Sequence, residues 1–234
     1  MDRSVITLGI ETATQVVSVA LGGDEGPLGV VEIMQGRRHA EILTPAIEFV
    51  CRQAGVDIRD IGAIGVDVGP GLFTGMRVGI ATAKAMAQAL DIVLVGVSSL
   101  DVLAHPLRHA DKVIASVIDA RKGEVFTAFY LPASDGARRV SEPIACSVDD
   151  FNAAVAARGQ QVIAVGDGAH RYREQLSVGI EVADLGHPSA VPLVHLARVM
   201  ALRSDVGMPG ADNLAGVVPM YLRLPDAQIN WSTR

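Results

Sequence analysis

The chain has 234 residues, of which 50% are hydrophobic, 20% charged and only 4% aromatic. This composition excludes a disordered chain and allows one large domain or two small ones, most simply of the α/β class. A net charge of −6 argues against a chain that by itself binds the backbone of a long nucleic acid. Because the N-terminus has no signal-peptide pattern and no apolar run could span a membrane, we expect a cytoplasmic protein.

The N-terminal part begins with a predicted hairpin. Val5–Ile10 and Val16–Leu21 are apolar enough for buried strands, and Glu11–Thr14 is too short for anything but a turn between them. A third strand is expected at Val30–Met34. A helix from about Arg37 to Ala54 follows it.

The next unit runs from a strand through a glycine-rich turn into a helix. Ile61–Val68 feeds the turn, in which Gly69 and Gly71 can adopt backbone angles closed to other residues, and Thr74 is the predicted helix cap. With the strand at Ile92–Val97, this predicts a right-handed parallel βαβ unit. Another helix is expected to begin at Ser98–Asp101, with Ser98 or Ser99 as its cap.

One stripe of that helix carries only small side chains, which lets another backbone approach closely. It consists of Gly75, Gly79, Ala83 and Ala87. Arg77 lies in the first turn, where the helix dipole disfavours a cation. The position of Arg77 indicates an acidic partner.

A second hairpin, Val113–Leu131, aligns with residues 5–21 at a constant offset and places Asp119 where the first hairpin has Glu11. Duplication explains this match, and chance similarity of two apolar hairpins is the alternative. We expect an N-terminal lobe over residues 1–108 and a C-terminal lobe over 109–234, with the segment from about residue 190 packing back on the first.

After the second hairpin we expect a polar link at Pro132–Ser141, a helix at Val148–Arg158 and a strand at Val162–Val165. A further helix is expected at Pro188–Arg203 and an extended segment at Val217–Leu224.

The glycine-rich turn invites a phosphate-binding interpretation, because free amides at a helix start bind anions. Its spacing matches neither the Walker pattern nor the dinucleotide fingerprint, so a packing or docking turn is the favoured interpretation.

Glu11 and Asp119 could hold Mg²⁺ between the lobes, or could serve only turn chemistry. His105 and His109 have the spacing of a helical metal pair, but Pro106 lies between them. We predict no catalytic residue and no metal site.

Seven stretches resemble the bacterial TsaB family, the dimerisation subunit of the machinery that makes threonylcarbamoyladenosine on tRNA. They are IETAT followed by VVSVAL, HAEILTP, GPGLFTGMRVGIATAKAMA, VSSLDVLA, IDARKGEVF, VGDGA and PMYLRLPDA. The resemblance implies an actin-like (ASKHA) fold of two ribonuclease-H-like lobes, the second reduced. It also implies a non-catalytic subunit that pairs with a TsaD-like transferase and a TsaE-like ATPase, contacts tRNA only through the complex, and forms a homodimer when alone.

In this family the first-lobe helices form the pairing face. The partner-binding residues implied are His39, Ile42, Leu43, Ala46, Phe73, Gly75, Met76, Arg77, Gly79, Ile80 and Ala83. ATP or ADP with magnesium is the weaker alternative ligand, with Glu11, Thr12, Asp119, Gly166, Asp167 and Gly168 as its candidate site. His39 stands without the second histidine of the TsaD metal pair, which fits loss of that metal.

This sequence departs from the family at two positions, with Glu11 where Asp is usual and Leu72 where Ser is usual. The second change removes a hydroxyl and weakens the phosphate interpretation. The alternative function is an active actin-like ATPase or sugar-kinase-like enzyme, and a metallopeptidase would need ligands that the sequence lacks.

Overall fold

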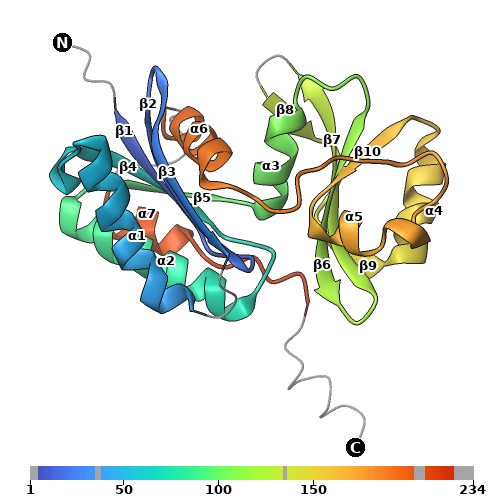
Figure 1. Cartoon of the computed structure of the whole chain (residues 1–234), viewed down its shortest axis with the longest axis horizontal. Coiled ribbons are helices and arrows are strands. Elements are labelled where there is room, and N and C mark those ends of the chain that lie inside the picture. The colour runs from blue at the N-terminus through green and yellow to red at the C-terminus, as the bar shows by residue number, and fades with distance from the viewer. Residues whose placement is uncertain (1–4, 35–37, 134–135, 203–208, 224–234) are drawn as a thin grey trace, which may run out of the picture.

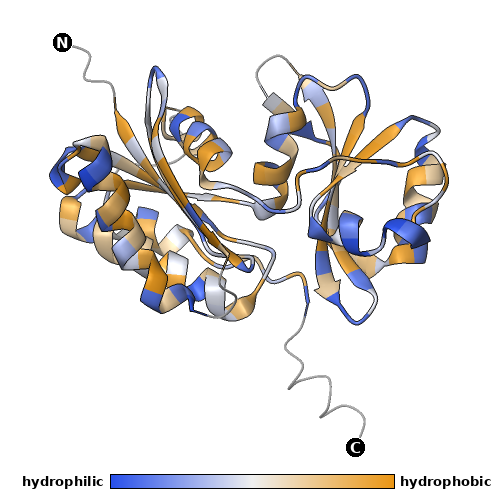
Figure 2. Cartoon of the chain, viewed as in Figure 1, coloured by the Kyte–Doolittle hydropathy of each residue, from blue (hydrophilic) through white to orange (hydrophobic). Residues whose placement is uncertain are grey.

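The computed structural model describes residues 5–34, 38–133, 136–202 and 209–223. These residues form two lobes side by side, each built around one β-sheet (Figure 1). Apolar residues concentrate on the strands and on the helix sides that face them (Figure 2). Each sheet therefore has its own core.

The first sheet has five strands. In spatial order they are β3 (Gly26–Met34), β2 (Val16–Gly23), β1 (Ile6–Glu11), β4 (Ile61–Asp67) and β5 (Val93–Val97). Strands β3, β2 and β1 pair antiparallel, whereas β1, β4 and β5 pair parallel. The predicted first hairpin and the parallel βαβ unit through helix α2 (Phe73–Leu90) are both confirmed.

Helices cover both faces of the first sheet. On one face lie α2 and α1 (His39–Ala54), and on the other lies α6 (Ala190–Ala201), which contacts β1, β4 and β2 (Figure 1). Helix α6 comes very close to the sheet, because a Cβ atom on Gly65 would lie only 2.5 Å from the Cβ of Ala197. A helix from far along the chain thus completes the core of the first lobe.

The second sheet repeats the strand order and directions of the first. Its strands are, in spatial order, β8 (Gly136–Arg139), β7 (Glu124–Ala133), β6 (Val113–Arg121), β10 (Val162–Val165) and β11 (Glu181–Val182), with β9 (Ile144–Ser147) paired to β7. Antiparallel β8, β7 and β6 are followed by parallel β10 and β11, as in the first sheet. This confirms the duplicated actin-like fold, and the reduction is clearest in β11, which has two residues where β5 has five.

Helices also flank the second sheet. Apolar residues of α4 (Val148–Arg158) and α5 (Asp167–Arg171) pack on one face, and those of α3 (Ser99–Ala104) on the other. Helices α3 and α6 contact each other between the two sheets. The remaining short elements are η1 (Ile58–Asp60), η2 (His105–Leu107), η3 (Arg173–Gln175) and α7 (Ala211–Gly216).

Most element boundaries agree with the sequence, and α4 and β10 have the predicted ones. The Thr74 cap is wrong: Leu72 is the residue before the first turn of α2, with no side-chain cap, and Thr74 lies inside that turn. Ser98 does cap α3 through the amide of Leu100. Strands β8 and β9 were not expected, and residues 217–223 are irregular, with Leu224 outside the described residues.

The lobe division at residue 108 stays a prediction. Helix α3 precedes that position, yet its Leu100 and Leu103 belong to the apolar cluster on the second sheet. Helix α3 thus belongs to the first lobe by its place in the sequence but packs on the sheet of the second lobe. Helix α6 belongs to the second lobe by its place in the sequence but packs on the sheet of the first.

Candidate partner-binding face

The Gly-Pro-Gly turn is held against the turn that joins β1 and β2. The amide of Leu72 donates to the carbonyl of Ala13 at 2.6 Å, and the Thr12 hydroxyl donates to the carbonyl of Gly75 at 2.9 Å. A Cβ atom on Gly71 would lie 2.1 Å from the Ala13 oxygen. Because Gly71 presses on the backbone of Ala13, this loop is a packing turn.

Two carboxylates are completely buried beneath the turn. Asp67 accepts hydrogen bonds from the Gly69 amide at 2.7 Å and the Ser99 hydroxyl at 2.6 Å, while its other oxygen has no partner among the described residues. Burial raises the pKa of Asp67 to about 7. Burial, followed by repulsion from Asp67, raises the pKa of Glu11 well above its usual value. Glu11 accepts from the amide of Ala13 at 2.9 and 3.1 Å, so it serves the turn despite its length.

The small-residue stripe of α2 faces the sheet. A Cβ atom on Gly75 would lie 2.0 Å from the Thr12 carbonyl oxygen, and one on Gly79 would lie 2.3 Å from the Thr12 hydroxyl. Ala83 and Ala87 are also buried. The backbone that approaches this stripe therefore belongs to its own lobe.

The implied partner-binding residues divide into buried and accessible ones. Buried in the first lobe are His39, Leu43, Ala46, Gly75, Met76, Gly79, Ile80 and Ala83. His39 donates from Nε2 to the carbonyl of Thr14 at 2.7 Å, which ties α1 to the β1–β2 turn. Only Phe73, Arg77 and the half-buried Ile42 reach the surface. The partner-binding role stays a prediction, and any direct contact must come from outward-facing residues of the same helices.

Those outward-facing residues lie on two neighbouring helices, and we term this set the outer face. On α2 it comprises Phe73, Arg77, Ala81, Ala85 and Ala89, and on α1 it comprises Glu41, Pro45, Glu48, Phe49 and Arg52. The two helices contact each other and lie side by side on the same face of the sheet (Figure 1). The spacing of Arg77, Ala81, Ala85 and Ala89 shows a second stripe, four residues apart, that sequence reasoning missed because it considered only the first.

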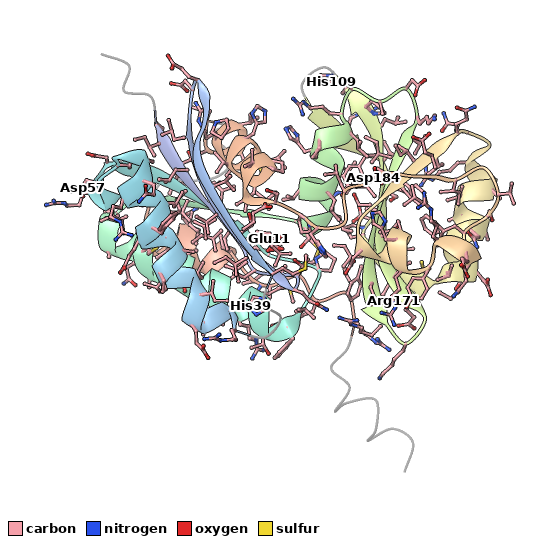
Figure 3. All side chains as sticks on the ribbon, viewed as in Figure 1. Glu11, His39, Asp57, His109, Arg171 and Asp184 are labelled. Atoms are coloured by element: carbon pink, nitrogen blue, oxygen red, sulfur yellow. The ribbon has the colours of Figure 1, made fainter. Side chains whose placement is uncertain are left out.

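The candidate nucleotide residues are only partly brought together. Asp119 and Asp167 line a cavity of about 310 Å³ between the lobes, and the amide of Asp119 donates to Asp167 at 2.9 Å. Burial raises the pKa of Asp167. Glu11 and Thr12 lie inside the first lobe instead, with Glu11 near its boundary with the second lobe (Figure 3).

The glycines of the candidate nucleotide site are used for packing. A Cβ atom on Gly166 would meet the carbonyl oxygen of Val117 at 2.4 Å, and one on Gly168 would meet the carbonyl carbon of Ile118 at 2.8 Å. Neither has space beside it for a ligand.

This arrangement does not fit a magnesium nucleotide. The carboxylate of Glu11 is buried and engaged with an amide, and Asp119 pairs with Arg121 at 3.0 Å and Arg171 at 3.5 Å and accepts from the Tyr172 hydroxyl at 3.1 Å. A metal-bridging pair would need both carboxylates to face the cleft. The acidic residues at the two equivalent turns therefore stabilise their own lobes.

The His105 and His109 spacing does not form a metal pair. His105 is buried and its ring lies 4.8 Å from that of His195 in α6. Within the described ranges, no three His, Cys, Asp or Glu side chains converge in an arrangement that could hold a metal ion. No helix in the same ranges is long and apolar enough to cross a membrane.

Comparison with known proteins gives the family. A family model described as TsaD, tRNA N6-adenosine threonylcarbamoyltransferase, matches residues 22–231. The chain belongs to this family. Within the TsaD family, it is similar to the tRNA threonylcarbamoyladenosine biosynthesis protein TsaB of Bacillus subtilis, with 26% identity over 96% of both chains. It is also similar to the Escherichia coli protein of the same name, with 36% identity over 55% of this chain and 56% of that one.

A solved structure agrees over almost the whole chain. It is a Pseudomonas aeruginosa protein described as similar to the peptidase YeaZ, with 26% identity, a TM-score of 0.79, and coverage of 94% of this chain and 100% of that one. The resemblance to TsaB is thus confirmed.

Proposed function

We propose that this TsaD-family chain is a non-catalytic subunit of the complex that makes threonylcarbamoyladenosine on tRNA. Its relatives in Bacillus subtilis and Escherichia coli are named for that biosynthesis. In this proposal a TsaD-like transferase carries out the chemistry, a TsaE-like ATPase joins the complex, and tRNA is contacted only through the complex. The cytoplasm, where tRNA is modified, is the expected compartment.

The observation that carries the proposal is the exposed row of alanines on α2. Ala81, Ala85 and Ala89 are exposed, and Phe49 on neighbouring α1 leaves 47% of its surface exposed. Small side chains let two helices approach to the short end of the usual 8–10 Å range, and an exposed aromatic ring supplies an apolar anchor. Two helices with these properties suit a helical partner.

In this proposal, helices of the partner pack closely against the alanine row of the outer face. Since one chain offers the same surface to any copy of itself, the same face can form a homodimer when the transferase is absent. The transferase and a second copy then compete for one surface.

The test is a binding measurement between the full chain and its TsaD-like partner, combined with an assay of modified tRNA. Ala85→Arg places a long charged side chain on the exposed row, and we expect pairing to weaken by roughly 2–3 kcal/mol, or about 100-fold, with loss of tRNA modification. Ala153→Arg is the matched control, because Ala153 is an exposed alanine of α4 in the second lobe.

Equal binding by Ala85→Arg and Ala153→Arg would contradict the proposed pairing face. The alternative of an active ATPase has its own test, which is ATP hydrolysis by the isolated chain with magnesium. The buried Glu11 and the arginine-paired Asp119 disfavour it. Turnover by the isolated chain would contradict the non-catalytic role.

A further inference from the structure

Arg77 contacts two aromatic rings at the start of α2. Its guanidinium carbon lies 3.8 Å from the ring centre of Phe73 and 5.9 Å from that of Tyr221. The Arg77 Nε donates to the Tyr221 hydroxyl at 2.9 Å, and the two rings stack at 5.4 Å. We refer to Phe73, Arg77 and Tyr221 as the arginine clamp.

Among the residues that the structure describes, the charge in the clamp has no counter-ion. Within the described residues, Arg77 forms no ion pair and its two terminal nitrogens form no hydrogen bond. The first turn of α2 contains no acidic residue, and the dipole there opposes a cation. Contact with the ring faces offsets part of that cost. The described part of the chain therefore leaves both terminal nitrogens available to an external acceptor.

Tyr221 is fixed by contacts to both lobes. The amide of Met220, directly before it, donates to the carbonyl of Val68 at 2.7 Å. Arg223, two residues later, donates to the carbonyl of Ala120 at 3.1 Å and pairs with Glu124 at 3.2 Å. Because the segment is anchored on both sides of Tyr221, the clamp is ordered before any partner arrives, and this lowers the entropic cost of binding.

We propose that the arginine clamp binds a carboxylate of the partner subunit, with Tyr221 as the residue that positions Arg77. This rests on the proposed function, because the clamp lies on the outer face of α2. A guanidinium whose two terminal nitrogens are free matches the two oxygens of a carboxylate. The C-terminal segment around Tyr221 is then part of the interface, although it lies 144 residues from Arg77 in sequence.

Arg52 on α1 provides an internal comparison. It is also exposed on the outer face, but it lies 5.8 Å from the single ring of Phe49 and is bonded to no second ring. A cation at that distance from one ring is weakly held. Substitution of Arg52 therefore measures how much an arginine outside the clamp, on the same face, contributes to partner binding.

The experiment measures binding of the full chain to its TsaD-like partner at low and high salt. Arg77→Gln is expected to weaken binding by about tenfold, the usual scale for a lost charge-assisted contact at an interface, and by less at high salt. Arg52→Gln is the matched control, with a change below about twofold. Thermal unfolding of each variant checks that the fold is intact.

Substitutions of Tyr221 test its positioning role. Tyr221→Phe keeps the ring and removes the hydroxyl bond, so a loss of a few-fold is expected, and Tyr221→Ala should approach the loss caused by Arg77→Gln. If Tyr221 acts through Arg77, combining Tyr221→Ala with Arg77→Gln adds little beyond either change alone. Fully additive losses would overturn the positioning role.

The outcomes separate this inference from the proposed function. If Ala85→Arg weakens pairing but Arg77→Gln does not, the pairing face stands and the carboxylate contact is overturned. If neither variant weakens pairing, both fail. If Arg77→Gln leaves pairing unchanged and weakens tRNA binding by the assembled complex, the clamp contacts RNA phosphate and the carboxylate proposal is overturned.

Discussion

The two sides of helix α2 carry similar small residues but have opposite surroundings. The inner side, with Gly75, Gly79 and Ala83, presses on the β1–β2 turn and the sheet. The outer side, with Ala81 and Ala85, is exposed. A row of small residues therefore shows only that something can approach closely; the fold decides whether that neighbour is the same lobe or another molecule.

The largest expected effect comes from adding volume on the inner side. Gly75→Val would place a Cβ atom 2.0 Å from the backbone oxygen of Thr12, which cannot move without displacing the whole turn. We expect a loss of about 3 kcal/mol or more in the free energy of unfolding, measured by urea denaturation, or failure to fold. Ala81→Val, the matched outer change, should cost only about 0.5 kcal/mol from helix propensity. Similar losses of stability for Gly75→Val and Ala81→Val would contradict the difference in burial between the inner and outer sides of α2.

The second prediction concerns the buried carboxylate that anchors the loop before α2. Because burial raises the pKa of Asp67 from its ordinary value of 3.8 to about 7, the native state keeps a proton that the unfolded chain releases at lower pH. Stability from this group is thus lost as the pH rises from about 4 to about 7, and stays low above that. Asp67→Asn removes this dependence.

We expect Asp67→Asn to be more stable than the unchanged chain at pH 8, by about 2 kcal/mol, with little difference near pH 4. The amide oxygen can still accept from Gly69 and Ser99. Urea denaturation across that pH range measures the effect, and Glu48→Gln, an exposed change on α1, is the control. A steeper loss of stability with rising pH in Asp67→Asn would show that the carboxylate is ionised in the native state.

The smallest expected effect comes from one hydrogen bond on the inner side. Thr12→Val keeps the shape but removes the hydroxyl that donates to the carbonyl of Gly75 at 2.9 Å. The free energy of unfolding should fall by about 1 kcal/mol. Thr74→Val changes an exposed threonine of α2, directly before Gly75, and should lower the free energy of unfolding by less. If Thr12→Val costs no more than Thr74→Val, the bond to Gly75 does not secure the helix start.

Local signals predicted the elements well where periodicity and capping agreed. Helix α4 has the predicted bounds because Ser147 caps it and Gly159 ends it in a left-handed conformation. The Thr74 cap failed because the helix start is fixed instead by the bond from Leu72 to Ala13, which lies in the turn between β1 and β2. Residues 217–223 look extended in sequence but bond to Val68 and Ala120 at separate points and join neither sheet.

The duplication, the α/β class and the family could be predicted from the sequence alone, because hydrophobic periodicity and local motifs depend on neighbouring residues. The sequence also predicted that α2 carries small side chains every fourth residue. The folded chain was needed to show which side of α2 is buried, that Glu11 and Asp67 lie beneath the turn, and that Tyr221 reaches Arg77. A helical period specifies which residues share a side, whereas the neighbour of each side depends on contacts between residues far apart in the chain.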